Sequence, residues 1–308
     1  MSDTPCPLVY DIRDLVKCYS GRARPANDHI TLQIHRGEIF GLLGDNGAGK
    51  STLVRQMANL LRSTGGRVSL FGQPLGADPL HVPRHVGYMP QSGGALNNLT
   101  VAEALYFMAH LRGLSRGEAR AERDALLETW QLTAIRHVYS ARLSGGQARL
   151  LQLAAAMAGS PPVLILDEPT ANLDPRRRAL VWDTLRRVNS DRWTTIIFIT
   201  HDAIEAEKAI QRVGIMRAGA LVALGRPADL KRQVDQQLRL ELSFAPATPP
   251  RLPDGLTRME RAPGHWLILL DWEQVPAVLA QVRRDQVDDF RLYSATLEDL
   301  YLHYVTRS

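Results

Sequence analysis

Alternating and unbroken runs of apolar residues predict several strands in the first part of the chain. Residues 30–34 alternate strictly between apolar and polar side chains, and residues 8–19 alternate loosely, as half-buried strands do. Residues 163–166 form an unbroken apolar run, and 194–200 contain a second one between threonines, which is typical of parallel strands buried on both faces. Another apolar run, 39–43, stands directly before a glycine-rich segment. These patterns predict an α/β core with an antiparallel part beside it.

Helical spacing of apolar residues follows in two places. One helix is predicted over 52–61, directly after the glycine-rich segment. Residues 100–158 carry i, i+3, i+4 spacing with almost no strand signal, and 100–103 and 115–118 have the residue types of capping boxes. We therefore predict a helical subdomain over about 92–160, which is too short for a long coiled coil.

The pattern changes near residue 230. Shorter apolar segments on either side of a proline-rich turn predict a mixture of strands and helices. Strands are expected at 238–244, 266–270 and 290–293, and helices at 273–284 and 296–304. The chain is thus predicted to form a large domain over 1–230 and a small α+β domain over 231–308.

Composition points to a soluble protein of a reducing cytosol. Of the 308 residues 45% are hydrophobic, but no apolar run approaches the roughly 18 residues of a membrane span. The N-terminus lacks the pattern of a secretion signal, and Cys6 and Cys18 cannot form a disulfide framework. The net charge of +5 comes from the first 230 residues, and the near-neutral remainder argues against a nucleic-acid partner. Any contact with a membrane is expected to pass through a partner.

The glycine-rich segment has the form G-x-x-x-x-G-K-S of a phosphate-binding loop. It lies between a predicted strand and a predicted helix, where backbone N–H groups and the helix dipole both favour a polyphosphate. Lys50 is expected to reach the outer phosphates and Ser51 to ligate Mg²⁺. The candidate residues are Gly44, Asp45, Asn46, Gly47, Ala48, Gly49, Lys50, Ser51 and Thr52.

Three further polar residues follow the two buried apolar runs. Asp167 and Glu168 come directly after the first run, and His201 follows the second. The carboxyl ends of parallel strands lie at one edge of the sheet, where ligands bind in open α/β folds. Asp167 is expected to hold Mg²⁺, and Glu168 to accept a proton from a water that attacks the γ-phosphate.

A second motif, Leu143, Ser144, Gly145, Gly146 and Gln147, stands before a helical run and about twenty residues before the carboxylates. Together with the phosphate loop it makes residues 8–225 resemble the ATP-binding subunit of ABC transporters. The resemblance implies a P-loop ABC ATPase core with an antiparallel β subdomain and a helical subdomain. It also implies ATP and Mg²⁺ as cofactors.

The resemblance assigns roles to further residues. Gln91 matches the glutamine that contacts Mg²⁺ and the attacking water and that links the site to the membrane partner. Asp174 matches the loop that communicates across a dimer, and His201 matches the histidine that hydrogen-bonds the γ-phosphate. Tyr19 matches the aromatic residue that stacks on adenine, with Tyr10 as the alternative.

In this family the segment 143–147 closes over ATP held by a second subunit, so two cassettes, identical or different, sandwich two nucleotides. The resemblance therefore implies an ATPase at the cytoplasmic face of the membrane, bound to a separate integral membrane subunit. Residues 296–301 resemble the end of drug and antibiotic exporter cassettes, where this region helps dimerise or regulate. We expect an exporter; an importer subunit and a soluble cassette ATPase of DNA repair or translation are the alternatives.

Overall fold

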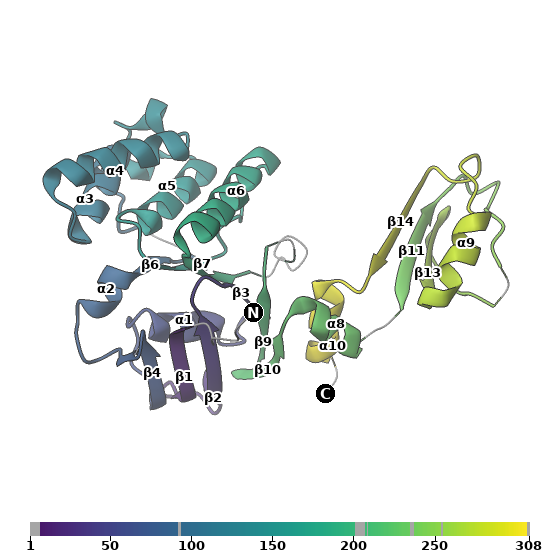
Figure 1. Cartoon of the computed structure of the whole chain (residues 1–308), viewed down its shortest axis with the longest axis horizontal. Helices are drawn as coiled ribbons and strands as arrows, with labels where there is room; N and C mark the ends of the chain where they lie inside the picture. The colour runs from purple at the N-terminus through teal and green to yellow at the C-terminus, as the bar shows by residue number, and fades with distance from the viewer. Residues whose placement is uncertain are drawn as a thin grey trace, which may run out of the picture. The chain divides into compact units, whose positions relative to one another are not determined.

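The computed structural model describes residues 7–91, 94–200, 207, 209–234, 237–253 and 255–306. The chain forms two compact units, Met1–Gly225 and Arg226–Ser308 (Figure 1). The boundary falls slightly earlier than the sequence pattern suggests, because helix α8 (Pro227–Val234) contacts α10 (Leu297–Thr306) of the second unit.

A six-stranded sheet forms the centre of the first unit, in the order β10-β9-β3-β8-β7-β6. Its strands pair in parallel except for the antiparallel edge pair of β9 and β10. The strands are β3 (Ile39–Gly44), β6 (Val86–Met89), β7 (Val163–Asp167), β8 (Thr195–Ile199), β9 (Arg212–Arg217) and β10 (Ala220–Gly225). The predicted α/β class is confirmed, whereas β9 and β10 were not predicted.

A four-stranded antiparallel sheet, in the order β2-β1-β4-β5, lies beside this core (Figure 1). Its strands are β1 (Leu8–Lys17), β2 (Asn27–His35), β4 (Gly65–Leu70) and β5 (Gln73–Pro74). The strict alternation of β2 arises because its apolar residues Ile30, Leu32 and Ile34 all face the core.

Several helices of the first unit begin at side-chain caps. The side chains of Thr100 and Ser115 accept hydrogen bonds from the N–H groups of Glu103 and Glu118, so both predicted capping boxes are confirmed. The helices are α1 (Lys50–Met57), α2 (His81–His85), α3 (Val101–Leu111), α4 (Arg116–Thr129), α5 (Gly145–Met157) and α6 (Pro175–Arg192). Among the described residues, no helix has both the length and the apolar character needed to cross a bilayer.

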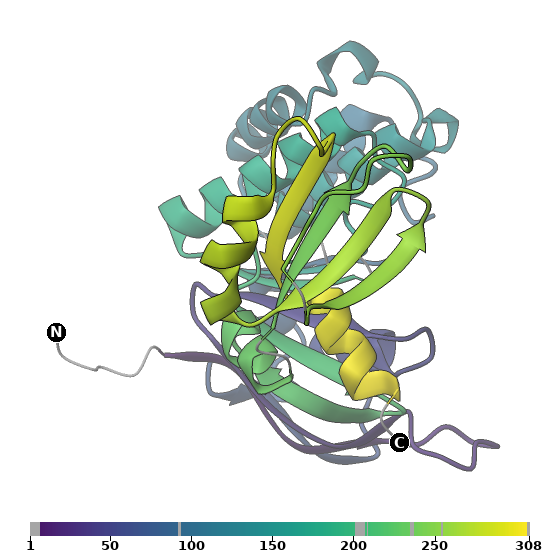
Figure 2. The same ribbon diagram turned by 90° about the vertical axis from the view of Figure 1, so that its right-hand side faces the viewer.

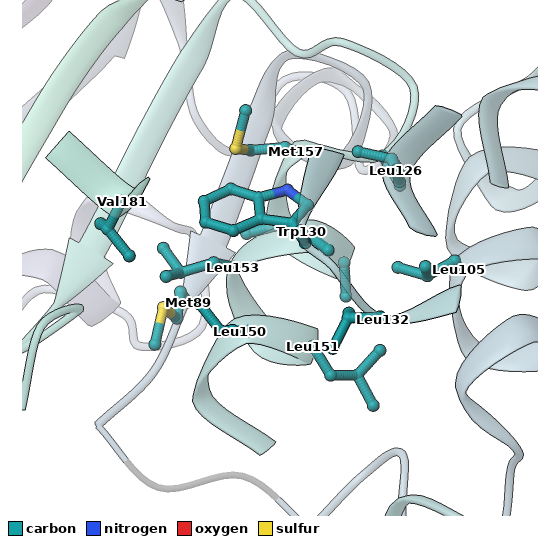
Figure 3. Packing of buried hydrophobic residues seen from close by; sticks show 14 of the residues in the cluster. Met89, Leu105, Leu126, Trp130, Leu132, Leu150, Leu151, Leu153, Met157 and Val181 are labelled. Atoms are coloured by element: carbon teal, nitrogen blue, oxygen red, sulfur yellow. The ribbon is translucent and has the colours of Figure 1, made fainter. Parts of the chain in front are cut away.

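Two hydrophobic clusters cover the two faces of the central sheet. Leu164 and Leu166 of β7 pack with the helical layer, whereas Val163 and Ile165 pack with α1 and the antiparallel sheet. This explains why residues 163–166 are all apolar. Figure 3 shows the helical-side cluster around the fully buried Trp130.

The second unit is a four-stranded antiparallel sheet, in the order β12-β13-β11-β14, with a short helix on one face (Figure 2). Apolar residues of β11 and β13 pack against Val278 of that helix. The elements are β11 (Leu238–Ser243), β12 (Thr257–Ala262), β13 (His265–Leu270), α9 (Val275–Gln281) and β14 (Asp289–Ser294). Strand β12 was not predicted, because every one of its residues is exposed and it carries no apolar alternation.

Candidate nucleotide-binding site

The phosphate loop joins the end of β3 to the start of α1. Gly47 and Gly49 have φ angles of 86° and 101°, a region that favours glycine. A Cβ on Gly49 would also lie 2.1 Å from the carbonyl oxygen of Ala26. As the N-cap of α1, Gly49 has no side chain to accept from the first helical N–H groups. The loop therefore presents these donors to an anion.

The side chain of Lys50 folds back onto the phosphate loop. Its Nζ donates to the carbonyl oxygens of Gly44, at 2.6 Å, and Asp45, at 2.9 Å. Burial lowers the pKa of Lys50, and the negative charges of Glu168, Asp167 and Asp45 oppose that shift. The ammonium group is thus close to the loop and to both carboxylates that follow β7.

Two buried amides hold the loop from below, and the sequence analysis missed both. Asn27 Nδ2 donates to the Gly49 carbonyl at 3.0 Å, and Gln56 Nε2 donates to Asn27 Oδ1 at 2.7 Å. Asn27 is fully buried and Gln56 is 2% exposed. The sequence offered one signal, the polar Asn27 at the start of a strand whose core-facing residues are otherwise apolar. That signal did not identify Gln56 as its partner.

Asp167 and Ser51 come together beside the loop. Burial raises the pKa of Asp167, and the Glu168 carboxylate raises it further, while Lys50, Arg149 and a hydrogen bond with Ser51 lower it. A hydroxyl and a carboxylate next to a phosphate loop are the hard oxygen donors that suit Mg²⁺. In the described part of the chain no cluster of three or more His, Cys, Asp or Glu residues could hold a metal. A magnesium ion here would depend on oxygen atoms of the nucleotide as well.

Glu168 is held in an unusual backbone conformation. Its φ angle is 55°, and its N–H donates to the carbonyl of Ile199 at the end of β8, at 2.8 Å. The residue is 9% exposed. The ends of β7 and β8 are therefore tied together beside the phosphate loop. His201 lies outside the described residues, so its role stays a prediction.

The segment after β6 carries Gln91 to the neighbourhood of the carboxylates, because Met89 pairs with Leu166 in the parallel register. The Gln91 carbonyl accepts from Arg149 Nη1 at 3.2 Å. Burial lowers the pKa of Arg149, and the negative charges of Glu168 and Asp167 oppose that shift, so this arginine lies within electrostatic range of both carboxylates. Arg149 was not among the predicted site residues, although it follows the 143–147 motif by two positions.

The two candidate tyrosines occupy different environments. Tyr19 is half-buried, and its hydroxyl lies 3.5 Å from Oγ1 of Thr52, the residue that ends the phosphate-loop motif. Tyr10 has no exposed surface, and its hydroxyl donates to the Met57 carbonyl inside the core. The alternative assignment of Tyr10 to a base-stacking role is therefore wrong, because its ring is not accessible to a ligand.

The 143–147 motif begins α5. The Ser144 side chain accepts from the N–H of Gln147, and Gln147 Oε1 accepts from the N–H of Ser144 at 3.0 Å, which completes a capping box. Leu143 is half-buried, while Ser144 and Gly145 are exposed. The motif is thus an ordered helix start whose serine and first glycine face solvent.

Asp174 caps α6, where its Oδ1 accepts from the N–H of Arg177 at 2.9 Å. That hydrogen bond is the main reason that the pKa of Asp174 is lowered. The carboxylate is exposed, because 52% of the side chain remains accessible.

The parallel sheet, the glycine-rich loop and the Ser51, Asp167 and Glu168 residues beside it define a nucleotide-binding protein of the P-loop class. The model of the family described as ABC transporter matches residues 27–171. The chain is 37% identical over 232 residues to the daunorubicin/doxorubicin resistance ATP-binding protein DrrA of Streptomyces peucetius. The matched region covers 75% of this chain and 69% of that protein. The chain therefore belongs to the ATP-binding proteins of ABC transporters.

Longer proteins also contain a segment that is similar to this chain. Rat ATP-binding cassette sub-family A member 2 is 33% identical over 246 residues, which are 80% of this chain but 10% of that protein. The chain spans about a tenth of the length of such relatives. Among solved structures, an ATP-binding subunit of an ABC transporter is 28% identical with a TM-score of 0.68, covering 73% of this chain and 92% of that one.

Proposed function

We propose that the chain hydrolyses ATP as one half of a cassette dimer and thereby drives export through a separate membrane subunit. The observation that carries the proposal is that Lys50, Ser51 and the Asp167–Glu168 pair converge at one loop, whereas the Ser144 motif begins a different helix in the helical layer. Such a division suits a nucleotide that is bound by the phosphate loop of one molecule, in a site that the Ser144 motif of another molecule completes.

Each residue has a role in the proposed reaction. The loop N–H groups and Lys50 bind and orient the phosphates, and Ser51 with Asp167, and Gln91 beside them, would hold Mg²⁺. A Mg²⁺ ion held there would supply positive charge that offsets the negative charge developing on the phosphate oxygens. Glu168 positions the attacking water and accepts its proton, and His201 is proposed to orient the γ-phosphate. Tyr19 is proposed to stack on the adenine.

The second molecule is proposed to supply Ser144 and the residues around it. Backbone N–H groups at the exposed start of α5 favour a phosphate, so residues 143–147 would close over the ATP held by the partner's loop. Asp174 of the second molecule, in the loop before α6, would contact the same nucleotide. The partner is either a second copy of this chain or a related cassette.

A cavity in the helical layer supports docking of a membrane subunit. It has a volume of about 170 Å³ and is lined by residues that follow β6 and residues of α3 and α5, among them Pro90, Leu96, Met108 and Leu151. Nearby on α3, Phe107 is 42% and Leu111 79% exposed. An apolar surface next to Gln91 would let a helix of the membrane subunit respond to the nucleotide. With a membrane subunit docked there, the chain would lie at the cytoplasmic face of the membrane.

The direction of transport is inferred from the names of relatives. The Streptomyces relative is named for resistance to daunorubicin and doxorubicin, which favours export. Import remains the alternative. Purification of the chain from membranes together with its partner polypeptides distinguishes export from import, because an importer would co-purify with a substrate-binding protein.

The decisive test is the variant Glu168→Gln. It should bind Mg-ATP as the parent does, lose hydrolysis by at least about 100-fold because the proton acceptor is gone, and accumulate as an ATP-bound dimer. Phosphate release and analytical ultracentrifugation measure the two effects. The matched control, Glu128→Gln on the exposed side of α4, should hydrolyse normally. Hydrolysis by Glu168→Gln at the parental rate would show that the base is another residue.

A further inference from the structure

Arg177, the third residue of α6, contacts two segments that the proposed dimer uses. Its backbone N–H donates to Asp174 Oδ1 at 2.9 Å, and its Nε lies 3.5 Å from Asp174 Oδ2. Its Nη1 lies against Gly146, where a Cβ would be only 2.7 Å away. One guanidinium therefore touches both the Asp174 loop and the 143–147 motif.

The two segments also pack beneath this arginine. Leu173 is 3% exposed, and its Cδ2 lies 3.5 Å from the Cβ position of Gly146. The neighbouring Arg178 donates from Nε to the Leu173 carbonyl at 2.9 Å. The absence of a side chain at Gly146 is what lets the Arg177 guanidinium lie on the motif backbone, because any Cβ would displace it.

We propose that Arg177 is a positioning residue that holds the Asp174 loop against the 143–147 motif, so that both meet the second copy of the chain as one preformed surface. The proposal rests on the proposed function, because it concerns the same dimer. An arginine suits this role, since its planar fork can face a carboxylate with one edge while another nitrogen lies on the backbone. A preformed surface lowers the cost of ordering two loops when the dimer forms.

The size of the effect follows from exposure. The side chains of Arg177 and Asp174 are 38% and 52% exposed, so the ion pair by itself contributes little to folding. In a symmetric dimer each contact occurs twice, and the loss of both should weaken association on the order of tenfold.

The experiment measures ATP-driven dimerisation in the Glu168→Gln background by analytical ultracentrifugation. Adding Arg177→Met, which keeps most of the aliphatic stem, should weaken the dimer on the order of tenfold. The affinity of the monomer for Mg-ATP, measured by calorimetry, should stay at the parental value, because the contacts of Arg177 are with Asp174 and Gly146 and not with the phosphate loop. An unchanged monomer affinity also shows that the variant is folded.

Two further variants separate positioning from charge. Arg176→Met removes a neighbouring exposed arginine on the same helix and should leave dimerisation unchanged. Arg177→Lys can pair with Asp174 but cannot also lie on Gly146, so it should restore dimerisation only in part.

The outcomes are distinct. Equal dimerisation by the parent and Arg177→Met overturns the proposal, as does an equal loss in Arg176→Met or a complete rescue by Arg177→Lys, since these would point to net charge. If the Glu168→Gln parent itself fails to dimerise with ATP, the pairing of two identical chains fails, and this inference fails with it, whereas hydrolysis with a related cassette as the partner is tested separately.

Discussion

At the scale of single residues, Tyr10 and Tyr19 differ in what surrounds them rather than in what they are. Tyr10 lies within β1 on the face that packs into the core, and burial raises its pKa. Tyr19 follows the end of the strand, where its ring stays accessible and has the Lys17 ammonium 5.4 Å from its centroid. A residue's position relative to the last core-facing residue of a strand thus decides whether it can meet a ligand.

Substitution of these two tyrosines should give opposite results. Tyr19→Ala should weaken Mg-ATP binding by roughly 5- to 150-fold, because stacking of a base on an aromatic ring contributes about 1–3 kcal/mol. Tyr10→Phe should leave binding unchanged and lower the free energy of unfolding by about 1 kcal/mol, through loss of the hydrogen bond to Met57. Calorimetry and denaturant titration measure these effects. Unaltered binding by Tyr19→Ala would remove it from the site.

At the scale of elements, side-chain hydrogen bonds stabilise both ends of α5. Its start carries the Ser144–Gln147 capping box. At its end, the Arg112 guanidinium donates to the carbonyl oxygens of Ala155, Ala156 and Ala158. These carbonyls have no partner within the helix, and a cation at a helix C-terminus also interacts favourably with the helix dipole. A helix held in this way can carry its first residues to a partner without bending.

Removing the C-terminal contact should therefore affect stability. Arg112→Met should lower the free energy of unfolding by about 1–3 kcal/mol, because several half-buried carbonyls lose a charged donor. The change is measured as a lower denaturation midpoint. Arg120→Met, at an exposed position of α4, serves as the control and should change stability little. A midpoint unaffected by Arg112→Met would mean that water replaces the guanidinium without cost.

At the scale of the whole molecule, the proposed reaction needs two copies of the site. The first unit contains the phosphate loop, the carboxylates and the 143–147 motif, and its central sheet has a hydrophobic cluster on each face. The second unit has its own sheet and its own hydrophobic cluster. We infer that it assists dimerisation or regulation, as proposed for the end of exporter cassettes.

Dilution provides the test at this scale. The specific ATPase activity should fall as the protein concentration drops below the dimer dissociation constant, since each active site then lacks its second half. A phosphate-release assay over a thousandfold range of enzyme concentration at saturating Mg-ATP measures this. Constant specific activity in strictly monomeric samples would contradict the shared site.

The sequence by itself determined the features that depend on neighbouring residues. Glycines at 47 and 49 adopt the conformations that the loop needs, the capping boxes at 100 and 115 begin helices, and the apolar run 163–166 is buried on both faces. These signals are local because the backbone conformation or the periodicity of a short segment produces them. The family motifs are short segments of the same kind.

Tertiary structure decided the contacts between residues far apart in the chain. The Asn27–Gln56 amide pair, the Arg149 contact with Gln91, the Arg112 contact with the end of α5 and the Arg177 contact with Gly146 each join separate elements. No periodicity encodes such a pair, because each side chain finds its partner only when the sheets and helices pack. Strand β12 formed for the same reason: its backbone pairs with β13 although none of its side chains is buried.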